Sequence, residues 1–445
     1  MNRSRARRLL NQPASGEISV ARLFGDQPAS LLFRGLRRMA QFGRMLLQAV
    51  RPSPPHAAPS SGPTLVRYHE LVNSLELLDR PMPLTRFEYA VPNEATLIGR
   101  MARLAAKLVI DNYCTMRSSD PCAMAMRDQH AKAHGCVEAE FIVRDDLPAE
   151  FTTSLFRPGA RYPAIVRLSN GLGTPHSDKK IDARGMSIKL RGVDAPTILH
   201  TLAPHKARAG EHDFALSSFP IFFCKNVVDY SLFMEAITAS QVTWLDRFRK
   251  IARCLAFAIW HPRQVFLFLR TGIEGLLKIR NPLTATYHSM SPFLFGEDKV
   301  VRYVVGPTGR PDASDRWWTF FYRQRSESFL QDALVHDLDP ATRQPSDDIV
   351  FDFSIRVRDS ATSDDAEDAS RWWTAPLDRT VRLGSIAIPK QKFLAPDQVY
   401  DGEHMTFSPW NCLPQHRPIG SINRMRLAVY LASLQVRQKL NMVAS

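Results

Sequence analysis

Strand-like segments that lack regular intervening helices are the feature that most limits how this chain can fold. The clearest is IVFDFSIRV (349–357), in which apolar residues occupy every second position. This period of two is typical of a strand that buries one face. Similar segments occur at 163–170, 185–192, 299–306, 317–324 and 381–388. Their arrangement favours an antiparallel barrel or sandwich over a parallel sheet with a helix after each strand.

Residues 230–280 have instead a helical pattern. The stretch 251–270 is apolar enough to suggest a membrane span, but His261-Pro262-Arg263 interrupts it. Neither half reaches the roughly 20 residues that a span needs, so we expect a buried or interfacial pair of helices. The segment 362–368 (TSDDAED) is expected to be an exposed acidic loop. Strands and helices together predict an α+β protein.

The first 63 residues differ from the rest in charge. The 445-residue chain has a net charge of +14, and residues 1–63 contain ten arginines but only Glu17 and Asp26 as acidic residues. Residues 31–50 have the pattern of a basic amphipathic helix, which is typical of a membrane-surface element and equally of a helix docked on its own protein. A proline- and serine-rich linker follows at 51–63. We therefore expect a basic extension (1–63) and a globular domain (64–445).

This extension suggests some partners and excludes others. Residues 1–50 predict weak, salt-sensitive contact with anionic membranes. Nucleic acid is not expected, because the extension has no aromatic ladder beyond Phe24, Phe33 and Phe42. The six cysteines form no C-x-x-C pair, which indicates reduced thiols in a cytoplasmic protein, with or without membrane association.

One candidate site lies near the C-terminus. Ser421 is a good cap for a helix in which Arg426 and Tyr430 are four residues apart and so share a face. A cation beside a phenol favours the phenolate, the form in which tyrosine binds ferric iron. Taken alone the R-x-x-x-Y pattern has little weight, because helix surfaces produce it by chance.

Several motifs in a fixed order add a family resemblance. They are RDQHAKAHG (127–135), RLSNG (167–171), DARGMSIKL (182–190), DFALSSFPIFF (213–223) and the terminal R-x-x-x-Y. In this order they resemble the haem catalase superfamily, and most closely the small catalase-related proteins without the large C-terminal flavodoxin-like domain. The resemblance covers about 64–445. It implies an antiparallel β-barrel core with surrounding helices, haem b as cofactor, and a C-terminal helix that carries the iron ligand.

The resemblance also implies roles for the residues of the upstream motifs. His130 is similar to the distal histidine, which moves a proton between the two peroxide oxygens. Ser169 is similar to the serine that hydrogen-bonds this imidazole. Arg127 and Arg167 resemble the guanidinium groups that pair with haem propionates, and Tyr230 falls where an aromatic ring packs against the porphyrin.

At the C-terminus, Tyr430 resembles the proximal iron ligand and Arg426 the cation that keeps it ionised. One position departs from the family pattern. Ser217 stands where catalases usually carry a distal asparagine, and Phe219 replaces a threonine. A serine hydroxyl is shorter than an asparagine amide and offers a single rotating donor. This departure predicts weak catalatic activity and relatively strong activity as a peroxidase or on organic hydroperoxides.

The implied reaction is the two-electron breakdown of H2O2 or an organic hydroperoxide through a ferryl intermediate. Two alternatives stay open. One is a haem enzyme that rearranges fatty-acid hydroperoxides, and the other is a non-catalytic haem-binding protein of the membrane surface built on the same barrel. Assembly into a homo-oligomer also stays open.

Overall fold

The computed structural model describes Val72, Leu75 and residues 82–238, 244–308, 326–341, 349–374 and 378–444. The basic extension and the strand expected at 317–324 lie outside these residues. The chain divides into the units Met1–Pro52 and Ser53–Ser445, and the description below concerns the second.

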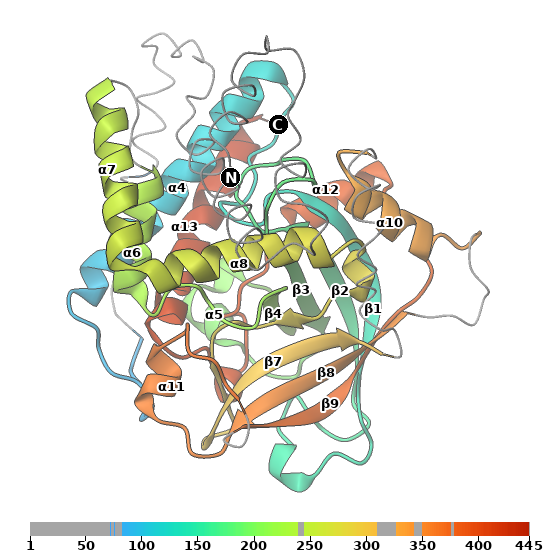
Figure 1. Ribbon diagram of the computed structural model, residues 1–445. Helices are drawn as coiled ribbons and strands as arrows, with labels where there is room; N and C mark the ends of the chain where they lie inside the picture. Colours follow the sequence, from blue (N-terminus) through green and yellow to red (C-terminus); the bar gives the residue numbers. More distant parts are fainter. Residues whose placement is uncertain are drawn as a thin grey trace, which may run out of the picture. The chain divides into compact units, whose positions relative to one another are not determined.

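A closed antiparallel barrel forms the centre of this unit (Figure 1). Its strands pair in the order β5-β4-β3-β2-β1-β9-β8-β7, and β5 also pairs with β7, which closes the ring of eight; β6 lies beside β7 outside this closure. The strands are β1 (Ala133–Val143), β2 (Arg161–Asn170), β3 (Arg184–Arg191), β4 (Glu211–Ser217), β5 (Tyr287–His288), β6 (Phe293–Phe295), β7 (Lys299–Pro307), β8 (Ile349–Arg358) and β9 (Asp378–Ile388). The antiparallel barrel predicted from the sequence is thus confirmed.

The barrel interior is filled by apolar and aromatic side chains. Because side chains alternate along a strand, every second residue of β8 points inward, and Phe351, Phe353 and Ile355 are completely buried. The Phe353 ring lies 4.9 Å from the rings of both Phe141 and Phe214, in edge-to-face contacts. The polar residues that alternate with these side chains point to the outer face of the barrel.

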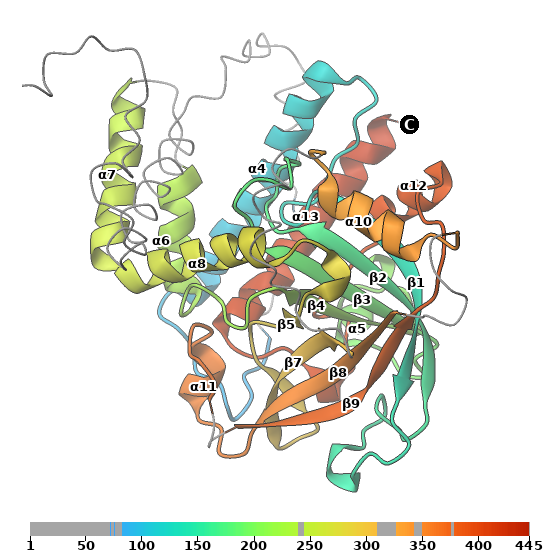
Figure 2. The same ribbon diagram turned by 45° about the vertical axis from the view of Figure 1, so that its right-hand side comes forward.

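Helices cover part of this outer face. The long helices α4 (Glu94–Ser119) and α13 (Ser421–Ala444) lie side by side, as Figures 1 and 2 both show. The described residues of the region 230–280 are mostly helical, as expected, and α7 ends directly before the His261-Pro262 interruption. The helices of this region are α6 (Val227–Thr238), α7 (Trp244–Trp260) and α8 (Pro262–Lys278), and the shorter helices elsewhere are α5 (Ile198–Leu202), α10 (Phe329–Leu338), α11 (Ser363–Glu367) and α12 (Pro396–His404). Among the described residues, none of the helices combines the length and hydropathy of a membrane span.

The prediction of an exposed acidic loop at 362–368 was wrong. Residues Ser363–Glu367 form helix α11, and the side chains of Asp365 and Glu367 are buried. Asp365 accepts a hydrogen bond from Arg358 Nη2 at 3.0 Å. Glu367 is buried against Arg424, which is 57 residues away in sequence, so only the tertiary structure brings this pair together.

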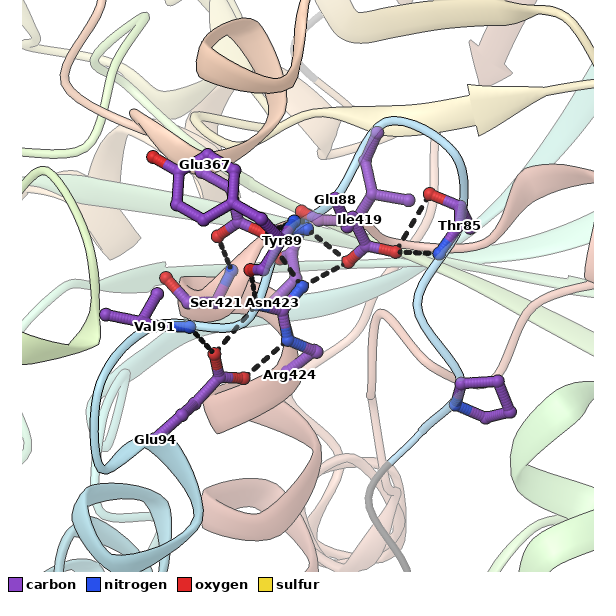
Figure 3. Close-up of polar contacts among 12 residues, drawn as sticks. Thr85, Glu88, Tyr89, Val91, Glu94, Glu367, Ile419, Ser421, Asn423 and Arg424 are labelled. Atoms are coloured by element: carbon purple, nitrogen blue, oxygen red, sulfur yellow. Dashed lines mark hydrogen bonds and ion pairs between the residues drawn. The ribbon is translucent and has the colours of Figure 1, made fainter.

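Arg424, in the first turn of α13, is the centre of a buried ionic network (Figure 3). Its guanidinium donates to Glu367 Oε1 and to Glu94 Oε2, both at 2.9 Å, and to the carboxylate of Glu88. Glu88 and Glu94 belong to the stretch that leads into α4, and Glu367 belongs to α11. One guanidinium therefore compensates three acidic groups and joins two distant segments to α13.

The same carboxylates also bind the start of α13. The Gly420 N–H donates to Glu88 and the Ser421 N–H donates to Glu367, each at 2.8 Å. Free N–H groups at a helix N-terminus attract negative charge, so this arrangement satisfies donors that lack a partner within the helix. The network therefore determines where the helix that carries Arg426 and Tyr430 begins.

We predict that Arg424→Met lowers the free energy of unfolding by about 3–5 kcal/mol, because it leaves buried carboxylates without a compensating cation. Urea denaturation followed by circular dichroism measures the change. Arg86→Met is the matched control. Its partner is Asp298, and the two side chains are 63% and 75% exposed, so its loss should cost about 0–1 kcal/mol. Equal effects of the two substitutions would contradict a special role for Arg424.

Candidate active site

Four residues in a row across neighbouring strands line one part of the outer barrel face. Ser169 on β2 pairs with Gly185 on β3, Gly185 with Ser217 on β4, and Ser217 with His288 on β5. Residues directly opposite one another in antiparallel strands have their side chains on the same face. The outer face therefore presents two hydroxyls and an imidazole around a glycine.

His130 packs against this row, on the loop that precedes β1. Its Nδ1 lies 2.9 Å from the carbonyl oxygen of Asn170 and 3.1 Å from Ser169 Oγ. A carbonyl can only accept, so Nδ1 carries the proton and Nε2 keeps its lone pair. A Cβ at Gly185 would lie 2.3 Å from His130 Nδ1, so only glycine leaves room for the ring.

The backbone of His130 is left-handed, with φ of 56°, a conformation that is uncommon outside glycine and that often marks functional positions. Burial lowers the pKa of His130 to about 4, helped by the charges of Arg167 and Arg426 and opposed by Asp182. The imidazole is therefore neutral at physiological pH and can accept a proton at Nε2.

The arginines of the upstream motifs meet at one carboxylate. Arg127 Nη1 lies 2.9 Å from Glu403 Oε2, and Arg167 Nη2 lies 3.2 Å from Glu403 Oε1. Arg437 of α13 donates to the backbone oxygen of Glu403 at 3.2 Å. Three buried or half-buried guanidinium groups thus surround a single glutamate on α12.

This cluster has more positive than negative charge. Burial and the neighbouring cation Arg167 lower the pKa of Arg437 to about 10, and burial with the charges of Arg167 and Arg437 also lowers the pKa of Arg127. The Nε of Arg167 is buried and has no hydrogen-bond partner among the described residues. The cluster is therefore suited to a further anionic group.

Arg426 and Tyr430 are neighbours on α13, as the four-residue spacing predicts. Arg426 Nη2 lies 3.3 Å from Tyr430 Oη, and its Nη1 lies 3.2 Å from both Ser291 Oγ and Asn423 Oδ1. These contacts hold the guanidinium against the phenol. Because the charge of Arg426 also acts on His130, the two motifs lie within electrostatic range although about 300 residues separate them in sequence.

Tyr230, on α6, lies near the loop that leads to His130. Its ring centroid is 5.6 Å from that of Phe222, and it lines a small cavity together with Gln129, Val429 and other residues. Burial raises the pKa of Tyr230, so it remains a neutral phenol. It is thus an aromatic side chain between the loop of His130 and α13.

The sequence interpretation missed four residues of this site: Gly185, His288, Glu403 and Arg437. Arg437 had a usable signal, because it lies seven residues after Tyr430 and so two helical turns farther along α13. Glu403 had none, since only the tertiary structure brings α12 to the two upstream arginines. His288 is recognisable only from the pairing of β4 with β5.

The chain is similar to known proteins in sequence and in fold. No protein-family profile matches the chain. Over 295 residues it is 26% identical to the catalase-related peroxidase of Mycolicibacterium paratuberculosis, an alignment that covers 63% of this chain and 79% of that protein. The chain is thus similar in sequence to a catalase-related peroxidase. The family expected from the motif order is thereby confirmed.

The fold of this catalase-like chain is similar to that of a bacterial catalase, with a TM-score of 0.51 and 14% identity. The match covers 82% of this chain and 65% of the catalase, so the chain spans about two thirds of that catalase's length. Both share the closed antiparallel barrel with helices.

We predict that Gly185→Ala displaces the His130 imidazole, because the added methyl would occupy the position of the ring. The free energy of unfolding should fall by about 1–3 kcal/mol, the usual cost of overpacking. Denaturation curves measure the loss, and the C–H signals of His130 in NMR spectra report its displacement. Gly99→Ala is the control, since a Cβ at this helical position has its nearest neighbour at 3.6 Å, and it should raise stability by about 0.5–1 kcal/mol.

Proposed function

We propose that this catalase-like protein binds haem b and breaks down H2O2 or organic hydroperoxides. The observation that carries the proposal is the pairing of two groups: a neutral His130 with an unprotonated Nε2, and Tyr430 held against Arg426 within electrostatic range of it. The named relative, a catalase-related peroxidase, supports the same reaction class.

The residues of the site fit haem. Tyr430 offers a phenol oxygen to the iron, and the adjacent Arg426 donates a hydrogen bond to that oxygen. Arg127, Arg167 and Arg437 have surplus positive charge for two propionates. When bound, haem supplies the redox chemistry that amino-acid side chains lack.

The protein's own residues then handle the proton. The proton on Nδ1 is held by the carbonyl of Asn170 and by Ser169, so the imidazole of His130 has one tautomer. Its Nε2 can take a proton from one peroxide oxygen and return it to the other, so that water rather than hydroxide leaves. The lowered pKa keeps this nitrogen available at neutral pH.

Ser217 affects which peroxide is processed. It is 6% exposed and adjacent to Gly185 on the distal face, and none of the described residues donates to or accepts from its hydroxyl. A hydroxyl cannot hold a second H2O2 as an amide can, because it offers a single donor on a shorter stem. We therefore propose that peroxidase-type turnover, or turnover of organic hydroperoxides, exceeds the release of oxygen.

A second candidate function is the rearrangement of fatty-acid hydroperoxides. The observation that favours it is the same lack of an amide beside His130, together with the apolar Phe219 that follows. Phe219 is 1% exposed and packs edge-to-face on Trp372 at 5.8 Å. Product analysis with a lipid hydroperoxide distinguishes the candidates, and a haem protein that leaves all peroxides unchanged would be the non-catalytic alternative.

We predict that Tyr430→Phe abolishes the tyrosinate-type absorption spectrum of the haem-loaded protein or prevents haem binding, because no anionic oxygen remains for the iron. Absorption spectroscopy of the purified protein is the measurement. Tyr400→Phe, at a tyrosine that is 54% exposed on α12, should leave the spectrum unchanged. An unaltered spectrum in Tyr430→Phe would exclude this residue as the ligand.

We predict that Ser217→Asn raises oxygen evolution from H2O2 relative to peroxidation of an organic reductant by about 10-fold or more, a typical effect of one positioned catalytic hydrogen-bonding group. The two rates are measured on the same preparation with an oxygen electrode and a chromogenic reductant. Ser354→Asn on β8 is the control and should leave the ratio unchanged. If the wild type evolves oxygen fast and Ser217→Asn does not raise that rate, then Ser217 does not limit the catalatic activity.

A further inference from the structure

Helix α7 is apolar on two opposite sides, and one of them packs against the protein. On this inner side Cys254 Sγ lies 3.3 Å from the Ala236 carbonyl oxygen, and the Phe257 ring lies 5.6 Å from that of Phe233. Both contacts are made with α6, which lies beside α7 in Figures 1 and 2. The inner side therefore accounts for the attachment of the helix.

The outer face of α7 consists of Phe248, Ile251, Leu255 and Ile259. The spacing of Phe248, Leu255 and Ile259 places them on the side away from Phe257. Ile251, three residues before Cys254, lies at the edge of this face. Phe248 is 68% exposed, Leu255 52% and Ile259 72%. Single exposed apolar residues are common, but a continuous stripe of large ones marks a surface that binds something.

Charge and an aromatic residue accompany this stripe. Helix α7 contains four basic residues and one acidic residue. Arg249 and Arg253 are exposed, and Arg249 Nη1 lies 3.8 Å from Asp246 Oδ1. Trp260, 80% exposed, ends the helix. Large apolar residues flanked by arginines and followed by tryptophan are typical of helices that lie in the interface of a bilayer.

We propose that the outer face of α7 docks on an anionic lipid surface, with Leu255 and Ile259 in the acyl boundary and Arg249 and Arg253 against the headgroups. Charge complementarity selects this occupant. In a symmetric contact between two copies of the chain, both copies would bring the net positive charge of α7 to the same interface, and this charge opposes the association. The proposal does not depend on haem binding, since none of the site residues belongs to α7.

Flotation of the full-length protein with vesicles tests the proposal. We expect binding to phosphatidylcholine vesicles that contain phosphatidylglycerol, weaker binding at high salt, and little binding to phosphatidylcholine alone. Leu255→Glu/Ile259→Glu should weaken binding about tenfold or more, because charged side chains would then enter the apolar layer. Leu394→Glu/Val399→Glu, at positions 42% and 44% exposed elsewhere, is the matched control and should bind like the wild type.

A second measurement reports the location of the helix. Lipids brominated on the acyl chain should quench part of the tryptophan fluorescence of the wild type, and Trp260→Phe should lose that quenched part. Circular dichroism melting checks that the glutamate variants fold.

Three results would overturn the proposal. The first is no vesicle binding at low salt. The second is that Leu255→Glu/Ile259→Glu binds vesicles like the wild type, whereas Arg34→Glu/Arg37→Glu/Arg38→Glu does not bind them. This result would assign the contact to the basic extension. The third is a dimer in sedimentation velocity that this α7 variant dissociates, which would assign the face to a second copy of the chain.

Discussion

The filled interior of the barrel is the constraint on which the rest of the structure depends. Rings such as Phe353 and Phe141 pack at 4.9 Å, and this core stabilises the barrel. Polar side chains that alternate with these rings must therefore point outward, and there they need partners. Those partners are supplied by the loop of His130 and by the helices, so the candidate site lies between the outer barrel face and α13.

Electrostatics connects the two sides of this site. Arg426 binds Tyr430 on the helix side and acts on His130 on the barrel side. Burial, together with the charges of Arg167 and Arg426, lowers the pKa of His130 and keeps its imidazole neutral. The same Arg426 thus contacts the phenol on one side and affects the proton acceptor on the other. The carboxylates around Arg424 keep this charge pattern in place, because they define the start of α13.

The residues paired with Ser217 show what a serine, in place of the asparagine expected from the resemblance, changes in the site. The backbone positions of Ser169, Gly185 and Ser217 follow one row of strand pairs, so a change of side chain leaves the frame of the site intact. What changes is the set of donors around His130. His288 lies next in the same row, and neither of its ring nitrogens has a hydrogen-bond partner among the described residues. The side chain at position 217 thus departs from the pattern that the resemblance implies, while strand pairing sets the backbone frame around it.

The sequence by itself determined the period-two strands, the helical segment broken at His261-Pro262 and the proximity of Arg426 to Tyr430. These features depend on residues close together in the chain, and local backbone geometry imposes them. The order of the motifs indicated the family resemblance, and this resemblance predicted His130 and Ser169 as site residues.

Only the tertiary structure decided which distant groups meet. Three examples join residues that are far apart in the chain. Glu403 lies between Arg127 and Arg167, and His288 lies beside Ser217. Glu367 is buried against Arg424, in a segment that the sequence predicts to be an exposed acidic loop. Neither composition nor periodicity predicts such contacts. A charged side chain is buried only where an opposite charge meets it, and the closed barrel and the path of α13 decide where that happens.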